Sequence, residues 1–110
     1  MTHNDVERAI RQECRAYCHR RSRIRMMGEG SVATAYLLLN RLIYDACKSV
    51  EQSNVLIRAP EFCDSMIDDI AYCRGYSTSK LAKYMSINTY KLKKREVKEA
   101  IAGLFGLEAK

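Results

Sequence analysis

One stretch of the sequence decides the expected fold: YCRGYSTSKLAKYMSINTYKLKKREVKEAI, residues 72–101. Between residues 76 and 100 it carries seven lysine or arginine residues against only two glutamates. Its apolar residues recur at helical spacing in two segments, a short one around Leu81 and Met85 and a longer one around Val97 and Ile101. Positive charge this dense around two short apolar stripes indicates that the partner of this segment is an anion.

The polar residues around these segments predict where the helices end. Gly75 stands where a left-handed cap would close a preceding helix. The short helix can be capped by Ser77, Thr78 or Ser79. In the turn after it, Ile87 can point back toward the core. A short helix, a tight polar turn and a long basic helix form the helix-turn-helix arrangement, in which the last helix enters the major groove of DNA.

The register of the long helix depends on which residue caps it. A cap at Asn88 turns Leu92 toward the core, whereas a cap at Ser86 turns Tyr90 toward the core. The stripe that begins at Tyr90 continues through Val97, Ile101 and Leu104. Ser86 is therefore the favoured cap.

In this register the long helix turns polar side chains outward. Asparagine can pair with adenine, and lysine or arginine with guanine, through base edges in the major groove, while other lysines neutralise phosphates. The residues expected to contact DNA are Ser77, Lys80, Lys83, Asn88, Thr89, Lys91, Lys94, Arg95 and Lys98.

Three further amphipathic segments precede this stretch. The first 25 residues show apolar residues near a helical period, with arginines on the outer side. Ser31 can cap a helix over residues 32–49, and Pro60 suits the first turn of a helix over residues 60–73. The expected core face of the second helix comprises Ala35, Leu38, Leu39, Leu42, Ile43 and Ala46. With no alternating strand pattern, the sequence predicts an all-α fold of about five helices in one compact bundle.

The length of 110 residues suits a single domain, with a helical part over residues 1–58 and the helix-turn-helix part over residues 59–107. The longest apolar run is interrupted by Asn40 and Arg41, far short of the roughly 20 apolar residues that a membrane-spanning helix needs. The charged amino terminus lacks the apolar middle region of a secretory signal. We therefore expect a protein that has no membrane segment and stays in the cytoplasm.

The five cysteines show no even framework of spacings, so we expect reduced thiols that are buried as small apolar side chains. The alternative is a zinc site formed by Cys14, Cys18, His19, Cys63 and Cys73. The last two cysteines are ten residues apart, unlike the short paired knuckles of zinc folds. We therefore expect no metal and no other cofactor.

The net charge of +6 is concentrated at two parts of the chain. Residues 1–25 hold seven arginines against three acids, whereas residues 26–75 hold four bases against seven acids. Two basic clusters in one small domain favour a shared anionic ligand. An enzyme is disfavoured, because His3 and His19 stand apart from any acid pair, nucleophile or phosphate-binding loop.

The string Tyr72, Gly75, Ser77, Leu81 and Ala82, followed by YMSINTYKLKKREVKEAIAGLFGL, resembles the carboxy-terminal helix-turn-helix of bacteriophage late-gene transcription regulators. These regulators include the Q-type antitermination proteins and the RinA- and ArpU-like activators. The resemblance covers about the last third of the chain, and the usual glycine of the turn is absent. It implies a small protein of a phage or prophage, located in the cytoplasm of the host bacterial cell, that binds double-stranded DNA and acts with host RNA polymerase on late genes, by activation or by antitermination.

RNA and protein are the alternative partners. RNA is disfavoured, because the chain has only two Phe and no Trp on which bases could stack. The other alternative is a basic helical protein that docks on a host protein without specific DNA binding. The sequence does not decide between a monomer and a homodimer.

Overall fold

The computed structural model describes residues 2–27, 30–53 and 58–107. Every regular element in these residues is a helix, which confirms the all-α prediction. The elements are α1 (His3–Met26), α2 (Ser31–Glu51), α3 (Phe62–Ala71), two short 3-10 helices, η1 (Tyr76–Thr78) and η2 (Lys80–Lys83), and α4 (Ile87–Leu104). The described residues thus contain four α-helices where about five were predicted. None of these helices is both long enough and apolar enough to cross a membrane.

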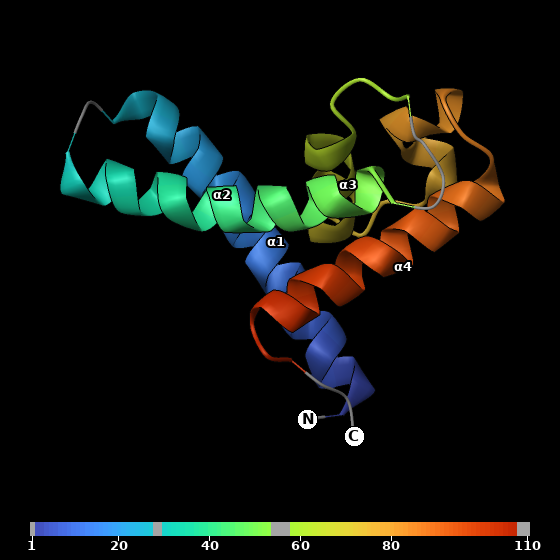
Figure 1. The fold of residues 1–110 in the computed structure, drawn as a ribbon, viewed down its shortest axis with the longest axis horizontal. Coiled ribbons are helices and arrows are strands. Elements are labelled where there is room, and N and C mark those ends of the chain that lie inside the picture. The colour runs from blue at the N-terminus through green and yellow to red at the C-terminus, as the bar shows by residue number, and fades with distance from the viewer. Residues whose placement is uncertain (1, 28–29, 54–57, 108–110) are drawn as a thin grey trace.

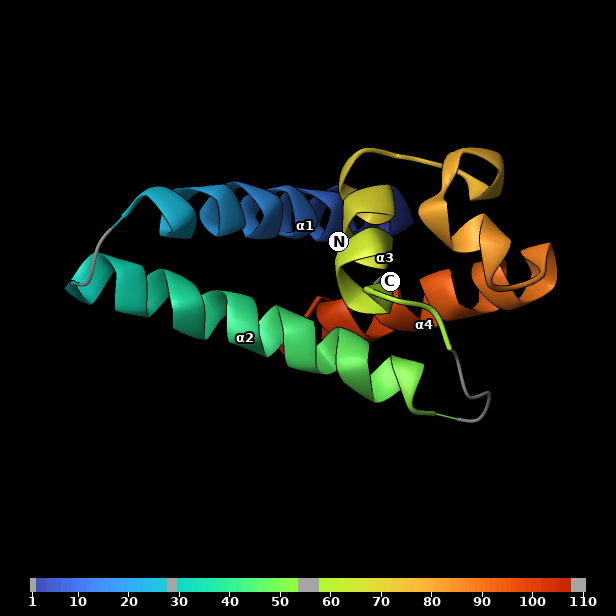
Figure 2. The same cartoon turned by 90° about the horizontal axis from the view of Figure 1, so that it is seen from above.

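α1 and α2 run antiparallel as a long hairpin, and the closed end of this hairpin extends away from the other helices (Figure 1, Figure 2). α3 packs against α1 and α2 near the open end of the hairpin, and α4 packs against the same part. The core of the molecule therefore lies at the open end, where all four α-helices meet.

The core is formed by apolar side chains from each of the four α-helices. Cys14, Ile43, Met66 and Val97 are all completely buried. Truncation of a large side chain at such a position typically costs about 2–5 kcal/mol of stability. The inward face of α1 follows the helical period of the sequence and comprises Val6, Ile10, Cys14, Tyr17 and Cys18.

The predicted core face of α2 lies only partly in the core. Ile43 is fully buried, but Leu38, Leu39 and Leu42 are 63%, 41% and 51% exposed. The stripe of α2 that does face the core comprises Ala33, Asn40, Ile43, Cys47 and Val50. The prediction was wrong because α2 carries two adjacent apolar stripes, and the stripe that is richer in leucine, which the prediction chose, is not the one that faces the core.

The starts of α2 and α3 differ by one or two residues from the prediction. Gly30 is the N-cap of α2, so Ser31 is the first residue of the helix and not its cap. α3 begins only at Phe62, because Glu61 adopts a left-handed conformation (φ 54°) that leaves Pro60 outside the helix.

The short helix predicted around Leu81 is replaced by 3-10 turns, and side-chain hydrogen bonds explain why. The Tyr76 hydroxyl donates to the carbonyl oxygen of Met85 (2.7 Å) and lies 3.1 Å from the carbonyl oxygen of Ala82. The Ser79 hydroxyl oxygen accepts a hydrogen bond from the Leu81 N–H at 3.0 Å. These side chains satisfy backbone groups that an α-helix would pair internally, and 3-10 geometry is usual in segments this short.

Cys73, and not Gly75, closes α3. Cys73 has a left-handed conformation, with φ 56°. Its N–H donates to the Ile70 carbonyl (3.5 Å), and the N–H of Arg74 donates to the Asp69 carbonyl (2.8 Å), which is the Schellman pattern. Gly75 is extended (φ −96°, ψ −178°), so the left-handed cap predicted there is wrong.

Candidate nucleic-acid interface

α4 begins with the Ser86 cap. The Ser86 hydroxyl oxygen accepts a hydrogen bond from the Thr89 N–H at 3.2 Å. Tyr90 is 2% exposed, whereas Leu92 is 36% exposed. The Ser86 register is therefore confirmed, and it fixes which face α4 turns to solvent.

Two apolar residues of α4 do not point inward as predicted. Ile87 is 46% exposed, because the helix already begins at this residue. The half-buried Met85 supplies the apolar contact of the turn instead. Leu104 is 39% exposed, because it ends α4 just before the chain reverses at Gly106 (φ 66°).

A buried hydrogen-bond network fixes α4 to the segments before it. Asp69 of α3 is 2% exposed and accepts hydrogen bonds from the hydroxyls of Ser79 (2.5 Å) and Tyr90 (2.9 Å). The rings of Tyr76 and Tyr90 pack edge to face, with centroids 5.5 Å apart. Burial, and then the hydrogen bond to Asp69, raise the pKa of Tyr90, so its hydroxyl remains a donor at neutral pH. The network holds α3, η2 and α4 in one arrangement.

Three of the residues predicted to contact DNA share the solvent face of α4. Asn88, Lys91 and Arg95 are exposed, and their spacing of three and four residues places them on neighbouring turns. The Arg95 side chain is 68% exposed, and its contact with Glu99 is a surface ion pair at 3.9 Å. Because such pairs contribute little energy, the guanidinium is available to another partner.

The predicted contacts before α4 are exposed as well. Ser77 lies in η1, and Lys80 and Lys83 lie in η2, and both segments pack against α4. Thr89 differs, because it is half-buried and its hydroxyl oxygen accepts a hydrogen bond from the Ser86 hydroxyl at 3.1 Å. Thr89 thus takes part in capping α4.

Lys94 and Lys98 are held by contacts within the molecule. Lys94 Nζ donates to the Arg74 carbonyl oxygen at 2.6 Å and lies 5.4 Å from the centre of the Tyr90 ring. Burial, and then the charge of Lys98, lower the pKa of Lys94. Lys98 Nζ pairs with the Glu7 carboxylate of α1 at 3.0 Å. Both lysines are less accessible than the sequence analysis assumed.

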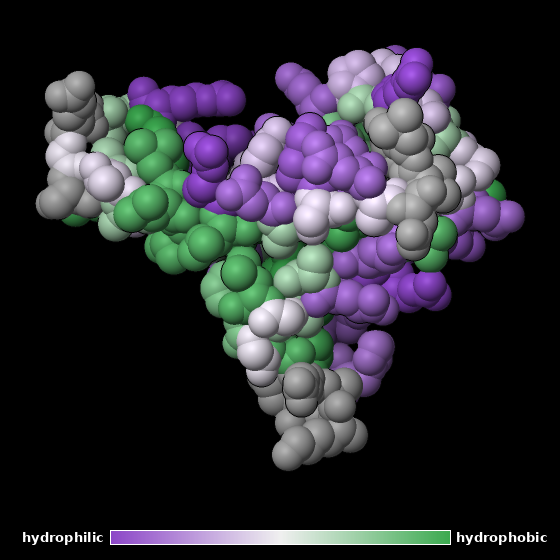
Figure 3. Space-filling model, viewed as in Figure 1, coloured by the Kyte–Doolittle hydropathy of each residue, from purple (hydrophilic) through white to green (hydrophobic). Residues whose placement is uncertain are grey.

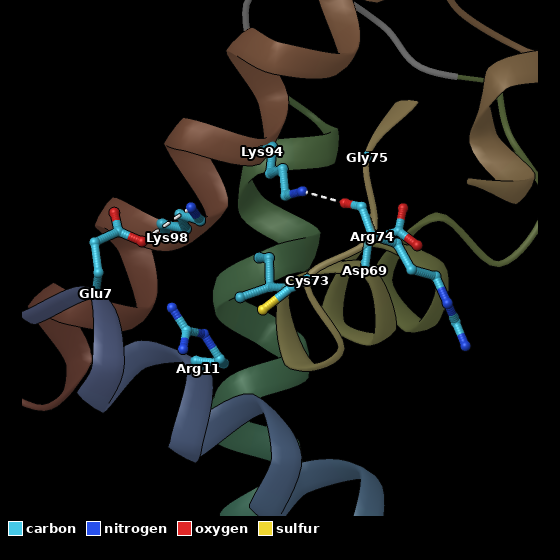
Figure 4. A pocket seen from close by; sticks show the side chains of 9 residues that line it. Glu7, Arg11, Asp69, Cys73, Arg74, Gly75, Lys94 and Lys98 are labelled. Carbon is cyan, nitrogen blue, oxygen red and sulfur yellow. Dashed lines mark hydrogen bonds and ion pairs between the residues drawn. The ribbon is translucent and has the colours of Figure 1, made fainter. Parts of the chain in front are cut away.

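The same two lysines line a pocket of about 300 Å³ between α1, α4 and the end of α3 (Figure 4). Arg11 of α1 and Arg74 also line this pocket, together with Glu7 and Asp69. The four basic side chains of the lining outnumber its two carboxylates, so the pocket carries a net positive charge. The fold thus brings together residues from the two basic clusters that lie far apart in the sequence.

η2 and α4 pack against each other, and their exposed cations are Lys80, Lys83, Lys91 and Arg95. No family model, curated protein or solved structure matches the chain. The function is therefore inferred from the geometry of these residues.

Part of the amino-terminal arginine cluster neutralises acids of α3. Arg21 pairs with Asp64 at 3.2 Å and with Asp68 at 3.0 Å. Arg15 donates through Nε to the Ala71 carbonyl oxygen at 2.8 Å. The acidic middle of the sequence is thus the partner of these arginines, which the opposite charges of the two segments could have indicated.

Lys93 contributes to the dense charge of the opening stretch, yet it is completely buried. Its Nζ donates to the carbonyl oxygens of Val50 (2.8 Å) and Ser53 (3.1 Å), at the C-terminal end of α2. The last carbonyl oxygens of a helix have no hydrogen-bond donor within the helix, and a lysine ammonium can donate to them. The sequence held a signal for this burial, since Lys93 precedes Val97 by four residues and so shares its inward face.

The cysteines are free thiols, and the exposed one is Cys73; the buried ones are Cys14, Cys18, Cys47 and Cys63. Burial raises the pKa of Cys14 and of Cys18 to about 12, and the Cys18 thiol also donates to Asp68 at 2.9 Å. Such thiols are protonated and unreactive at neutral pH. Within the described residues, no group of three His, Cys, Asp or Glu side chains is arranged to hold a metal ion.

Proposed function

We propose that this chain binds double-stranded DNA with sequence preference and acts as a transcription regulator. In this proposal α3, η2 and α4 form a helix-turn-helix unit, with η2 in place of the usual first α-helix and α4 in the major groove. The observation that supports it most is the solvent face of α4, where Asn88, Lys91 and Arg95 are exposed. The resemblance to bacteriophage late-gene regulators agrees with it and suggests host RNA polymerase, in the cytoplasm of a bacterial cell, as a second partner.

Two groups of residues have different roles in this proposal. Asn88, Lys91 and Arg95 read base edges, because a bidentate contact discriminates against a wrong base by about 1–3 kcal/mol. Lys80 and Lys83 contact phosphates, which adds affinity but no sequence information. The Asp69 network holds α4 in a single orientation, so that the base-reading side chains approach the groove in one geometry.

The pocket extends the proposed surface onto α1. A backbone phosphate at the pocket would meet the Arg11 guanidinium, which lies beside Lys94 and Lys98 (Figure 4). Lys98 would exchange its pair with Glu7 for a pair with the phosphate. In this way the amino-terminal helix takes part in binding the same DNA.

A protein that docks on a host factor is the second candidate, and the exposed apolar residues of α4 favour it. Ile87 and Leu92 are 46% and 36% exposed beside the cations of the same helix. A face of mixed apolar and cationic residues suits an acidic protein surface. In the DNA proposal these two side chains contact thymine methyl groups instead.

Selection of bound duplexes from a random pool tests the DNA proposal, followed by titrations of the recovered and a scrambled duplex across a salt series. We expect Lys91→Ala or Arg95→Ala to cost about 1–3 kcal/mol on the recovered duplex and much less on the scrambled one. Lys80→Ala should weaken both duplexes alike and reduce the salt slope by about one. Arg25→Ala is the matched control, because Arg25 is exposed at the closed end of the hairpin, far from α4 (Figure 1).

Two outcomes would contradict this function. An equal loss on both duplexes in the Lys91 and Arg95 variants would reduce α4 to a non-specific cationic surface. If no duplex binds at all, the docking protein becomes the function.

A further inference from the structure

α1 and α4 face each other at the cationic pocket with two charged residues each, and only one of the resulting pairs is complementary. Glu7 and Arg11 lie one turn apart on α1. Lys94 and Lys98 lie one turn apart on α4 (Figure 4). Lys98 Nζ contacts the Glu7 carboxylate at 3.0 Å, whereas the other two residues, Arg11 and Lys94, are both cations. The two helices therefore bring like charges together where an acid would stabilise the contact.

No carboxylate compensates these two cations within the part of the chain that the structure describes. Neither Arg11 nor Lys94 forms an ion pair there. Lys94 Nζ donates to uncharged oxygens instead, the Arg74 carbonyl at 2.6 Å and the Tyr90 hydroxyl at 3.5 Å. Burial, and then the charge of Lys98, lower the pKa of Lys94. An anion between α1 and α4 would offset this repulsion.

The charge and the size of the pocket indicate which anion fits. Its lining holds four basic side chains and two carboxylates, so positive charge exceeds negative charge by two. A phosphomonoester carries a charge of about −1.5 to −2 at pH 7, whereas a carboxylate or a DNA backbone phosphate carries a single charge. The volume of about 300 Å³ lies at the lower end of the range for small-molecule pockets. A small phosphomonoester therefore matches both properties.

Partial burial distinguishes the pocket from the other cations of α4. Figure 3 shows apolar surface over the first half of α2 and hydrophilic surface over the first half of α4. The exposed cations of α4 are Lys91 and Arg95, whereas Arg11, Lys94 and Lys98 are half-buried. Water screens a charge pair less at half-buried side chains than at exposed ones. An anion thus gains more from the pocket than from the open face of α4.

We propose that this pocket binds the phosphate group of a small phosphomonoester, between Arg11 of α1 and Lys94 of α4. The Arg11 guanidinium can donate two parallel hydrogen bonds to phosphate oxygens, and Lys98 can exchange Glu7 for a third. The bound ligand displaces a DNA backbone phosphate from the same cations and so lowers the affinity for DNA. Binding of the ligand does not require DNA, and only the competition rests on the proposed function.

Titration of the isotope-labelled full chain without DNA, followed by NMR at about pH 7.5, tests the binding. Methyl phosphate and dimethyl phosphate differ by one methyl group and one ionisable oxygen, so at equal ionic strength they isolate the effect of the dianion. We expect methyl phosphate to bind at least about tenfold more tightly and to shift the signals of Arg11 and Lys94. Inorganic phosphate, titrated in parallel, distinguishes the two sources of a dianionic phosphate. Tighter binding of the free ion than of the ester would overturn the proposal.

Variants of Arg11 test where the ligand binds. Arg11→Gln should weaken the binding of methyl phosphate at least about tenfold, because it removes a charged donor. Arg8→Gln is the matched control: Arg8 lies three residues away on the same helix, outside the pocket, and its side chain is 66% exposed. It should leave the binding unchanged. Arg11→Glu places an acid opposite Lys94, so it should abolish binding without lowering the melting temperature, which separates loss of the site from loss of folding.

Competition with the recovered duplex tests the effect on DNA. Saturating methyl phosphate should weaken duplex binding by the wild-type chain as much as Arg11→Gln does, and it should have no further effect on that variant. Equal binding of the two methyl esters, or unchanged binding in Arg11→Gln, would overturn the pocket assignment. Methyl phosphate that binds but leaves duplex affinity unchanged would overturn the competition alone. A chain that binds methyl phosphate but no duplex would support the pocket assignment and contradict the DNA proposal.

Discussion

A single buried lysine determines how α2 and α4 meet. The Lys93 ammonium is completely buried and donates to two carbonyls and to the Ser53 hydroxyl, at 3.2 Å. A buried charge is tolerated only when it is paired and hydrogen-bonded, and the negative end of the α2 dipole adds to these bonds. The buried Oε1 of Glu96 accepts no hydrogen bond within the described residues, and Lys93 Nζ lies 3.8 Å from it. The lysine therefore serves the folded structure and not the cationic surface.

We expect Lys93→Ala to lower the free energy of unfolding by about 2–4 kcal/mol, because it leaves buried carbonyls unpaired and opens a cavity. Lys91→Ala is the control, because it removes an exposed lysine two residues away on the same helix. It should change the free energy of unfolding by no more than about 0.5 kcal/mol. Urea unfolding followed by circular dichroism measures both. Equal unfolding midpoints for the two variants would show that Lys93 is not buried in solution.

At the scale of the elements, the sequence was enough to predict the buried face of a helix wherever the helix has a single apolar stripe that packs on one neighbouring surface. α1 and α4 each have one such stripe; the buried face of α1, the Ser86 cap and, apart from Leu104 and Lys93, the buried face of α4 follow the sequence pattern. α2 has two apolar stripes, and the one that is richer in leucine is exposed, so hydrophobic periodicity alone does not identify the stripe that the core uses. The conformation of η2 could not be predicted in this way, because it depends on the hydrogen bond between Ser79 and Asp69. These two residues lie ten positions apart and meet only in the folded chain.

The left-handed residue at the end of α3 gives a prediction about this element. Cys73→Gly should raise the free energy of unfolding by about 0.5–1 kcal/mol, because a non-glycine residue pays a steric cost at φ 56°. Gly75→Ala is the matched control: Gly75 is extended, and an added Cβ would meet no atom within 4 Å. It should be neutral or slightly stabilising. Thermal unfolding measures both, and a less stable Cys73→Gly variant would contradict the left-handed cap.

At the scale of the whole molecule, folding redistributes the charge that the sequence displays. The basic amino terminus and the acidic middle meet in part, through Arg21 with Asp64 and Asp68. The remaining positive charge includes the exposed cations of η2 and α4, which the sequence pattern indicated, and the pocket with Arg11, which it did not. Arg11 lies more than 80 residues from Lys94, and no local pattern joins them.

The buried thiols of α1 make the stability of the whole molecule sensitive to alkaline pH. The ordinary thiol pKa is 9.0, and burial raises it to about 12 at Cys14 and Cys18. Between these values the unfolded chain has lost protons that the folded chain keeps, so the free energy of unfolding falls as pH rises. The slope is at most about 1.4 kcal/mol per pH unit for each thiol.

Urea unfolding between about pH 8 and about pH 10.5 measures this slope. Cys14→Ala should reduce it, whereas Cys73→Ser, which removes the exposed thiol, should not. A stability that does not change across this range would contradict the burial of the two thiols.

α2 is one continuous helix whose two halves have different support. Its second half packs among α1, α3 and α4, whereas, within the part of the chain that the structure describes, its first half has only α1 beside it (Figure 1, Figure 2). Opening of the closed end of the hairpin therefore breaks fewer contacts than opening of the core, and amide protons in the first half should exchange with solvent sooner than those in the second. Any partner that covers the first half would join both halves into one cooperative unit and remove this gradient of exchange along the helix.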